Sequence, residues 1–217
     1  MGASGEQQGV TFVTLGPEGT CHERAVQNYA AFKGIEDFEM VLLTDFFVGL
    51  EMVRETPGTF LVQCSAHPKV HEITEKYWTE VFVVDTFIYP TKHLVVLSRR
   101  DVEQPRSLGI VPATKGYVKA ELEAGKWGEV IDVASKPLVA EGLSRGDYEA
   151  GLTHMEHFEE HPELLRLDLD IGEIDTTWVV YGSEKRFEGD LIGIPSASIY
   201  KDAAAEHEPV GAATVAS

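Results

Sequence analysis

Apolar runs separated by turn residues divide the first part of the chain into short strands and helices. Residues 10–16 (VTFVTLG) form an apolar run that ends at Gly-Pro, which predicts a buried strand. A helix is predicted next, with Thr20 as its N-cap and Glu23 as its capping-box partner. The elements predicted after it alternate: a strand at 38–45, a helix at 46–58 that Pro57-Gly58 stops, and a strand at 59–65. This order predicts an α/β layer with a mostly parallel sheet.

The alternation of strand and helix starts again near residue 107. Before that point lie a polar stretch at 66–79 and two apolar runs, 81–89 and 93–98, which predict strands. The second half is then predicted as strands at 107–113, 128–135 and 148–154, followed by helical stretches at 115–125, 136–146 and 155–165, respectively. A last apolar run at 176–183 (TTWVVYGS) predicts a strand that returns to the first half.

Two α/β halves and a returning strand predict two lobes with a cleft between them. The predicted boundaries are 10–98 plus 176–200 for lobe 1, 99–175 for lobe 2, a flexible N-terminus at 1–9 and a disordered polar tail at 201–217. Ligands of such folds bind at the carboxyl ends of strands, beside helix N-termini. The loops that follow the strands are therefore the predicted site.

The charge balance limits the partners that the protein can bind. A formal net charge of −18 argues against nucleic acid and against anionic membrane surfaces. No apolar run approaches the length of a membrane span, and the polar start of the chain does not resemble a signal peptide, so we expect a cytoplasmic protein. Two cysteines are too few for a disulfide scaffold. An anionic ligand would have to be held by local cations or helix N-termini.

Polar residues at the predicted strand ends are the candidates for such a site. They are Thr20, Cys21, His22, Cys64, Ser65, Thr114, Lys115, Ser135, Lys136, Thr153 and His154. Backbone N–H groups at helix starts bind carboxylates and phosphates, and the two lysines add positive charge. The predicted partner is therefore a small anionic molecule.

Each candidate also has a purely structural interpretation. Thr20 can serve only as an N-cap, and the two cysteines can be small buried apolar residues. His22 can lie on a helix surface. The series His154, His157 and His161 is more typical of an acidic helix surface than of a ligand set, so no metal is expected.

The stretch TLGPEGT, residues 14–20, resembles the first motif of the prephenate dehydratase family, a Gly-Pro-x-Gly-Thr turn after an N-terminal strand. The similarity extends over about residues 10–185 and includes the late segment DTTWVVYGS. The resemblance implies a two-lobed fold like that of type II periplasmic binding proteins, with prephenate in the cleft. Dimerisation is common in that family, which is the basis for expecting a homodimer.

Two departures from the family separate this chain from an ordinary dehydratase. The family's late Thr-Arg-Phe motif corresponds to Thr176, Thr177 and Trp178, so its carboxylate-binding arginine is missing, and VQCSAHPK replaces the Glu-Asn-Ser signature. The chain looks closer to the prephenate decarboxylases of bacilysin-type antibiotic pathways, which also lack the arginine and have a tryptophan in the late strand. Those enzymes have Ser-Ser where this chain has Cys21-His22. That difference leaves room for a related cyclic dienyl carboxylate, as in tropone-type pathways.

The resemblance implies a lyase that needs no cofactor, and GPEGT lacks the GxGxxG spacing of a dinucleotide site. We expect His22 to be the first choice of proton donor, ahead of His154 and Cys64, because histidine can hold a proton near neutral pH. Thr176 and Trp178 would contact substrate, and the helix start at Thr20–His22, with Lys115 or Lys136, would hold a carboxylate. The alternatives are a true dehydratase with a rebuilt site and a non-catalytic small-anion binding protein.

Overall fold

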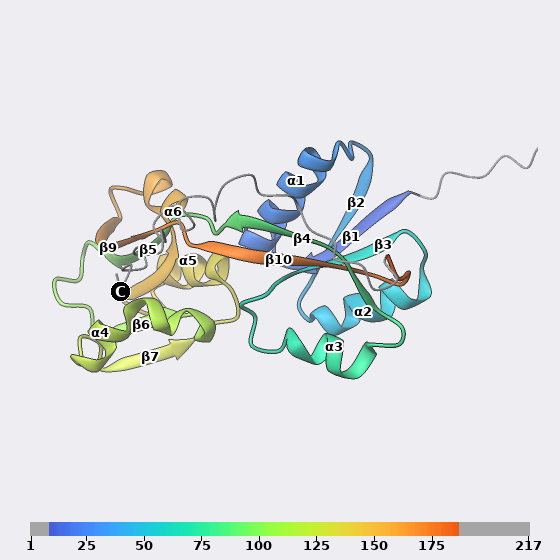
Figure 1. The fold of residues 1–217 in the computed structure, drawn as a ribbon. Helices are drawn as coiled ribbons and strands as arrows, with labels where there is room; N and C mark the ends of the chain where they lie inside the picture. Colours follow the sequence, from blue (N-terminus) through green and yellow to red (C-terminus); the bar gives the residue numbers. More distant parts are fainter. Residues whose placement is uncertain (1–8, 187–217) are drawn as a thin grey trace, which may run out of the picture. The chain divides into compact units, whose positions relative to one another are not determined.

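A computed structural model of the chain describes residues 9–186. The predicted tail at 201–217, the 187–200 part of predicted lobe 1 and all but Gly9 of the predicted flexible N-terminus lie outside the described residues. The first sheet has the strand order β2-β1-β3-β10-β4 (Figure 1). Its strands are β1 (Val10–Leu15), β2 (Phe38–Leu43), β3 (Thr59–Cys64), β4 (Phe82–Pro90) and β10 (Asp175–Gly182).

Helices cover both faces of the first sheet. They are α1 (Cys21–Lys33) on one face, and α2 (Phe46–Glu55) and α3 (His71–Tyr77) on the other (Figure 1). Successive residues of β1 serve the two faces: Phe12 packs with α1 and Val13 packs with α2, and both are buried. An apolar run without alternation is therefore what a strand buried on both faces requires.

The second sheet has the strand order β7-β6-β8-β5-β9. Its strands are β5 (Leu94–Arg99), β6 (Ser107–Ile110), β7 (Glu129–Asp132), β8 (Ala150–His154) and β9 (Leu165–Gly172). The helices of this lobe are the 3₁₀ helix η1 (Pro112–Val118), α4 (Lys119–Glu123), α5 (Lys136–Arg145) and α6 (Met155–Glu160). Val95 and Val96 of β5 belong to separate cores, one with α5 and one with η1.

Two extended segments connect the sheets, and their position corrects the predicted lobe boundary. The prediction placed 94–98 in lobe 1, but β5 pairs with β8 and β9 of the second sheet. The crossing occurs earlier, where Thr91 and Ile174 exchange two hydrogen bonds, at 2.9 and 3.0 Å. The returning strand β10 pairs with β3 and β4, as the apolar run at 176–183 predicted.

The two-lobed α/β architecture is confirmed, with differences in detail. Both sheets are mixed, because β10 and β5 run antiparallel to their neighbours. The predicted strand at 107–113 ends at Ile110, since Pro112 opens η1. The helix predicted at 115–125 is divided between η1 and α4. Helix α3, inside the predicted polar stretch, and strand β9 were both missed.

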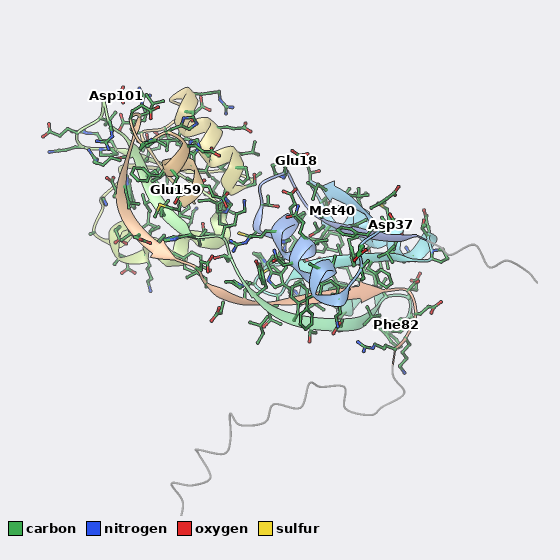
Figure 2. The ribbon with its side chains drawn as sticks, turned by 90° about the horizontal axis from the view of Figure 1, so that it is seen from above. Glu18, Asp37, Met40, Phe82, Asp101 and Glu159 are labelled. Carbon is green, nitrogen blue, oxygen red and sulfur yellow. The ribbon has the colours of Figure 1, made fainter. Side chains whose placement is uncertain are left out.

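The acidic residues labelled in Figure 2, Glu18, Asp37, Asp101 and Glu159, are all exposed and project from the surface. Negative charge is therefore displayed on both lobes, away from the cores. Within residues 9–186, no helix combines the length and apolar character that crossing a membrane requires.

Candidate functional site

A cavity of about 680 Å³ lies at the carboxyl ends of parallel strands from both sheets. Its walls come from the segments that follow β1, β3, β6 and β7, from the end of β8, and from the crossing segments. The predicted residues that line it are Thr20, Cys21, His22, Cys64, Thr114, Ser135, Lys136, His154, Thr176 and Trp178. The topological rule that ligands bind beyond strand carboxyl ends places a site at this position.

The turn before α1 shapes one wall of the cavity. Gly19 has a φ of +80°, a conformation that glycine adopts without steric cost. Thr20 caps the helix, because its Oγ1 accepts the Glu23 N–H at 3.3 Å and donates to the Leu15 carbonyl at 3.1 Å. The Glu23 carboxylate accepts the N–H of Gly19 at 2.6 Å. The predicted capping box therefore forms, with its return hydrogen bond one residue earlier than predicted.

Cys21 and His154 meet in this cavity, one from each lobe. The Cys21 Sγ lies 3.5 Å from the His154 Nε2, and both side chains are buried. The Lys92 backbone N–H donates to the same sulfur at 3.4 Å. Burial above all, and then the charges of Lys136, Lys92 and Arg24, lower the pKa of His154 to about 3. His154 is therefore a neutral imidazole at neutral pH.

His22 is also neutral, which corrects its predicted function. Its Nε2 lies 2.6 Å from the Gln63 Oε1, and its ring lies edge-on to Trp178, with 5.0 Å between centroids. Burial, partly opposed by the Gln63 hydrogen bond and aided by the charge of Lys136, lowers the pKa of His22 to about 4. The predicted imidazolium acid would be almost absent at neutral pH. His22 lines the site as a hydrogen-bonding group.

Cys64, the third of the predicted proton donors, also lines the cavity. Its Sγ lies 3.3 Å from the Thr176 Oγ1 and is partly exposed. Tyr117 lines the same cavity: burial raises the pKa of its phenol, and negative charge on Cys64 or Cys21 would raise it further. The contact between Cys64 and Thr176 joins β3 to β10 at the cavity wall.

Lys136 is the cation best placed to hold an anion. It lines the cavity, and within residues 9–186 it has no ion-pair partner. Its charge lowers the pKa values of both His22 and His154, so it lies within electrostatic range of both rings. Lys115 does not line the cavity and is paired with Asp132 at 2.5 Å. Ser65 is exposed and lies outside the cavity wall, so the prediction that Ser65 and Lys115 line the site is wrong.

Three other predicted residues satisfy local backbone groups. Ser135 caps α5 by accepting the Leu138 N–H at 3.4 Å. Thr114 donates its hydroxyl hydrogen to the Val111 carbonyl at 2.8 Å. Thr153 donates to the Lys136 carbonyl at 2.9 Å. Ser135 and Thr114 therefore do both: each hydrogen-bonds a local backbone group, and each lines the cavity.

Several residues of the wall were not predicted from the sequence. They include His67, Lys69, Tyr117, Asp132, Thr91 and Asp175. His67 and Lys69 follow β3, and Asp132 ends β7, so the strand-end rule that identified the others could have found them. Thr91 and Asp175 lie where the chain crosses between sheets, and only the strand pairing reveals that position.

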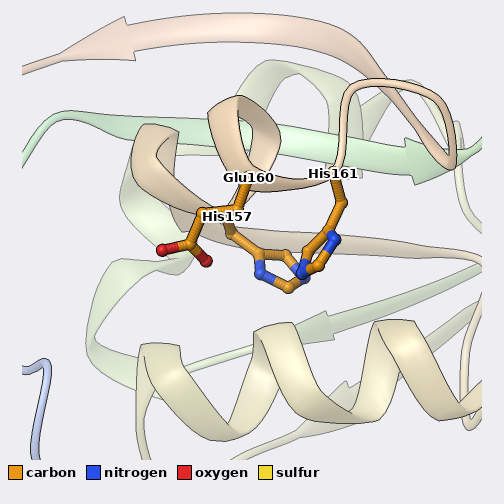
Figure 3. Close-up of side chains that lie close together, drawn as sticks. All are labelled: His157, Glu160 and His161. Atoms are coloured by element: carbon orange, nitrogen blue, oxygen red, sulfur yellow. The ribbon is translucent and has the colours of Figure 1, made fainter.

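A separate group of potential metal ligands lies at the C-terminal end of α6, with His161 as the residue that follows the helix (Figure 3). Ligand atoms of His157, Glu160 and His161 lie within 4.8 Å of one another. His157 Nε2 is 3.2 Å from Ser144 Oγ, whose hydroxyl donates to the Ala140 carbonyl. Of the two interpretations given for His154, a position on an acidic helix surface is wrong, because the residue is buried at the end of β8 and lines the cavity.

Comparison with known proteins gives a likeness in structure but none in sequence. No family model and no curated protein matches the sequence. A prephenate dehydratase from Staphylococcus aureus matches with a TM-score of 0.54 and 13% identity, over 82% of this chain and 69% of that one. GqqA, described as a novel type of quorum quenching acylase, matches with a TM-score of 0.51 and 10% identity, over 82% and 65%. An ABC transporter protein from Parabacteroides distasonis matches with a TM-score of 0.50 and 11% identity, over 92% and 70%.

At these identities the likeness establishes the fold and leaves the chemistry open. The similarity to a prephenate dehydratase agrees with the fold that the TLGPEGT motif implied. The chain has a two-lobed, periplasmic-binding-protein-like α/β fold of the kind found in prephenate dehydratase.

Proposed function

We propose that this protein is a cofactor-independent lyase that decarboxylates prephenate, or a similar cyclic dienyl carboxylate, without aromatising its ring. The observation that carries the proposal is the combination of Lys136, an unpaired cation within the described residues, with apolar walls in one cavity. A carboxylate suits the lysine, and a ring suits the surface around Tyr117. The dehydratase-like fold supports the same class of ligand.

The residues also favour loss of carbon dioxide over loss of the hydroxyl group. Aromatisation by dehydration needs an acid near the ring hydroxyl, and both cavity histidines next to Lys136 have pKa values lowered to about 4 or below. Thr177 occupies the place of the family's arginine and is exposed. These features remove groups that would help the hydroxyl to leave. They do not remove the cation that would anchor the second, pyruvyl carboxylate.

In the proposed reaction, the bond between the ring and its carboxylate breaks, and its electron pair forms a new ring double bond. The adjacent double bond then takes a proton at its far carbon, and the hydroxyl group stays. A thiol can supply that proton, and the resulting thiolate regains one from water. Of the three donors that the sequence predicts, the low pKa values exclude His22 and His154 and leave Cys64, whose sulfur lies 3.3 Å from the Thr176 Oγ1.

The alternative with its own supporting observation is a non-catalytic receptor for a small anion. The fold likeness to an ABC transporter protein and the neutral state of both imidazoles favour it. This alternative predicts carboxylate binding without turnover. The proposed lyase predicts carboxylate binding together with turnover.

The deciding experiment is incubation of purified protein with prephenate at mildly alkaline pH, with product identification by mass and ultraviolet spectrum. A non-aromatic dihydro-hydroxyphenylpyruvate, with carbon dioxide lost and the hydroxyl kept, supports the decarboxylase. Phenylpyruvate above the protein-free control would indicate a dehydratase. Calorimetric binding without any product would favour the receptor. A Lys136→Met variant run in parallel tests whether the reaction takes place in this cavity.

A further inference from the structure

The Cys21 sulfur contacts a backbone N–H donor and an imidazole. Cys21 is the first residue of α1, where unpaired backbone N–H groups concentrate positive potential. Its Sγ accepts the Lys92 N–H at 3.4 Å and lies 3.5 Å from the His154 Nε2. The sulfur and its two partners come from three separate parts of the chain. Hydrogen bonds to a sulfur strengthen when the sulfur carries negative charge.

His154 faces the sulfur as a proton acceptor. Its side chain is only 5% exposed, and its lowered pKa keeps the imidazole unprotonated. The three cations that disfavour a proton on His154 are Lys136, Lys92 and Arg24. The same positive charges favour a negative charge on the neighbouring sulfur. A proton on His154 is unfavourable by itself, so the thiol can pass its proton to this imidazole only while negative charge on the contacting sulfur or on the bound substrate offsets the new positive charge.

We propose that Cys21 and His154 form a nucleophilic pair that adds reversibly to an α,β-unsaturated carbonyl compound bearing a carboxylate. His154 Nε2 takes the thiol proton, and the sulfur electron pair forms a C–S bond at the β-carbon. The double-bond electrons move to the carbonyl oxygen as an enolate. His154 then returns the proton to the α-carbon, so the adduct contains all atoms of both reactants.

The cavity explains why this class of electrophile fits. Lys136 lines the same space and offers its charge to a carboxylate, and Tyr117, which is 38% exposed, adds aromatic surface for a flat conjugated group. Cys21 also lines the cavity, so an electrophilic carbon bound there can reach its sulfur. The inference does not depend on the lyase reaction proposed above, because it concerns the reactivity of one thiol.

Cys64 is a matched comparison within the same protein. It lines the same cavity and is more exposed than Cys21, which is 7% exposed. Its sulfur contacts the Thr176 hydroxyl, and no imidazole or backbone N–H within residues 9–186 forms a hydrogen bond with it. Accessibility alone therefore predicts that Cys64 reacts faster. Activation by His154 predicts that Cys21 reacts faster.

The test is reaction of the folded protein with limiting benzoylacrylate, followed by intact mass and peptide mapping. We expect an adduct equal to protein plus probe on Cys21, formed at least about tenfold faster than on Cys64. The His154→Gln variant should lose at least about tenfold of the Cys21 rate. The methyl ester of the probe should lose part of the preference for Cys21, since it has no charge for Lys136.

Faster or equal modification of Cys64 would overturn the inference, as would an unchanged Cys21 rate in a folded His154→Gln variant. If that variant does not fold, the comparison of the two thiols in the unaltered protein still decides. Turnover of prephenate with an inert Cys21 would refute this inference alone. A reactive Cys21 without turnover would refute only the proposed lyase.

Discussion

The His22 Nε2 and the Gln63 Oε1 lie 2.6 Å apart, and this contact fixes which ring nitrogen carries the proton. The Gln63 Oε1 also accepts the Cys64 backbone N–H at 2.8 Å, so this atom is the amide oxygen and His22 must be the donor. The Nδ1 of the neutral ring is then left as an acceptor. His22 can therefore orient a ligand hydroxyl, and the acid function predicted for it does not fit.

A Gln63→Glu substitution should convert His22 to the charged form. A carboxylate in place of the amide oxygen favours the imidazolium, so the pKa of His22 should rise from about 4 toward or above its ordinary value of 6.5. The shift can be measured by NMR titration of the histidine ring protons. Gln63→Met is the matched control and should leave the pKa low, because burial is the largest cause of its depression. A His22 that titrates near 6.5 in the unaltered protein would contradict the assignment.

The neutral His154 also predicts how stability depends on pH. Its folded pKa of about 3 lies below the ordinary 6.5, so between these values the unfolded chain binds more protons than the folded one. Its contribution to stability is therefore complete above about pH 6.5 and is lost as the pH falls toward 3. Between pH 7.5 and pH 5 this one residue should cost about 2 kcal/mol of the free energy of unfolding.

Urea unfolding at both pH values measures this cost. The His154→Gln variant, which cannot be protonated in this range, should lose less stability than the unaltered protein on the same change of pH. An equal loss in the two proteins would mean that His154 does not resist protonation.

The sequence predicted the location of the site better than its chemistry. Strand ends are visible as apolar runs that stop at turn residues, so Thr20, Cys64 and His154 could be assigned to one edge without a structure. The contact between Cys21 and His154 joins positions 133 residues apart, and no local pattern encodes it. The same holds for histidine pKa values, because burial sets them.

Two missed elements differ in how far they could have been predicted. Strand β9, LRLDLDIG, alternates apolar with polar residues, which is the period of a strand with one buried face, so this signal was present and was overlooked. Helix α3 has one fully buried apolar residue, Ile73, and seven residues in all, too few for a clear helical period. Its existence depends on packing against the first sheet.

Gly109 should tolerate no larger side chain, because Tyr148 packs directly against it. A Cβ at Gly109 would lie 2.4 Å from the Tyr148 ring, whose hydroxyl donates to the Val139 carbonyl at 2.7 Å. Gly109→Ala should therefore destabilise the protein by about 1–3 kcal/mol in urea unfolding. Gly116→Ala is the control and should change stability little, since no atom lies within 4 Å of its added Cβ. Equal effects of the two substitutions would refute the packing argument.

Lys136→Met should weaken binding of a cyclic dicarboxylate by at least about tenfold, because a hydrogen bond to a charged group contributes about 1.5–3 kcal/mol. Calorimetric titration measures the affinity. Lys119→Met makes the same charge change outside the cavity, at a lysine whose side chain is 73% exposed and paired with Glu123. The protein has a net charge of −18, so a purely long-range effect would weaken binding in both variants alike.

The two variants separate a local contact from the field of the whole protein. A loss confined to Lys136→Met would assign the carboxylate to the cavity. Equal losses would assign the effect to overall charge, and no loss in either would remove Lys136 from the site. The Lys136 substitution should also raise the pKa values of His22 and His154, since its charge lowers both. NMR titration of the two rings thus tests the position of Lys136 without any ligand.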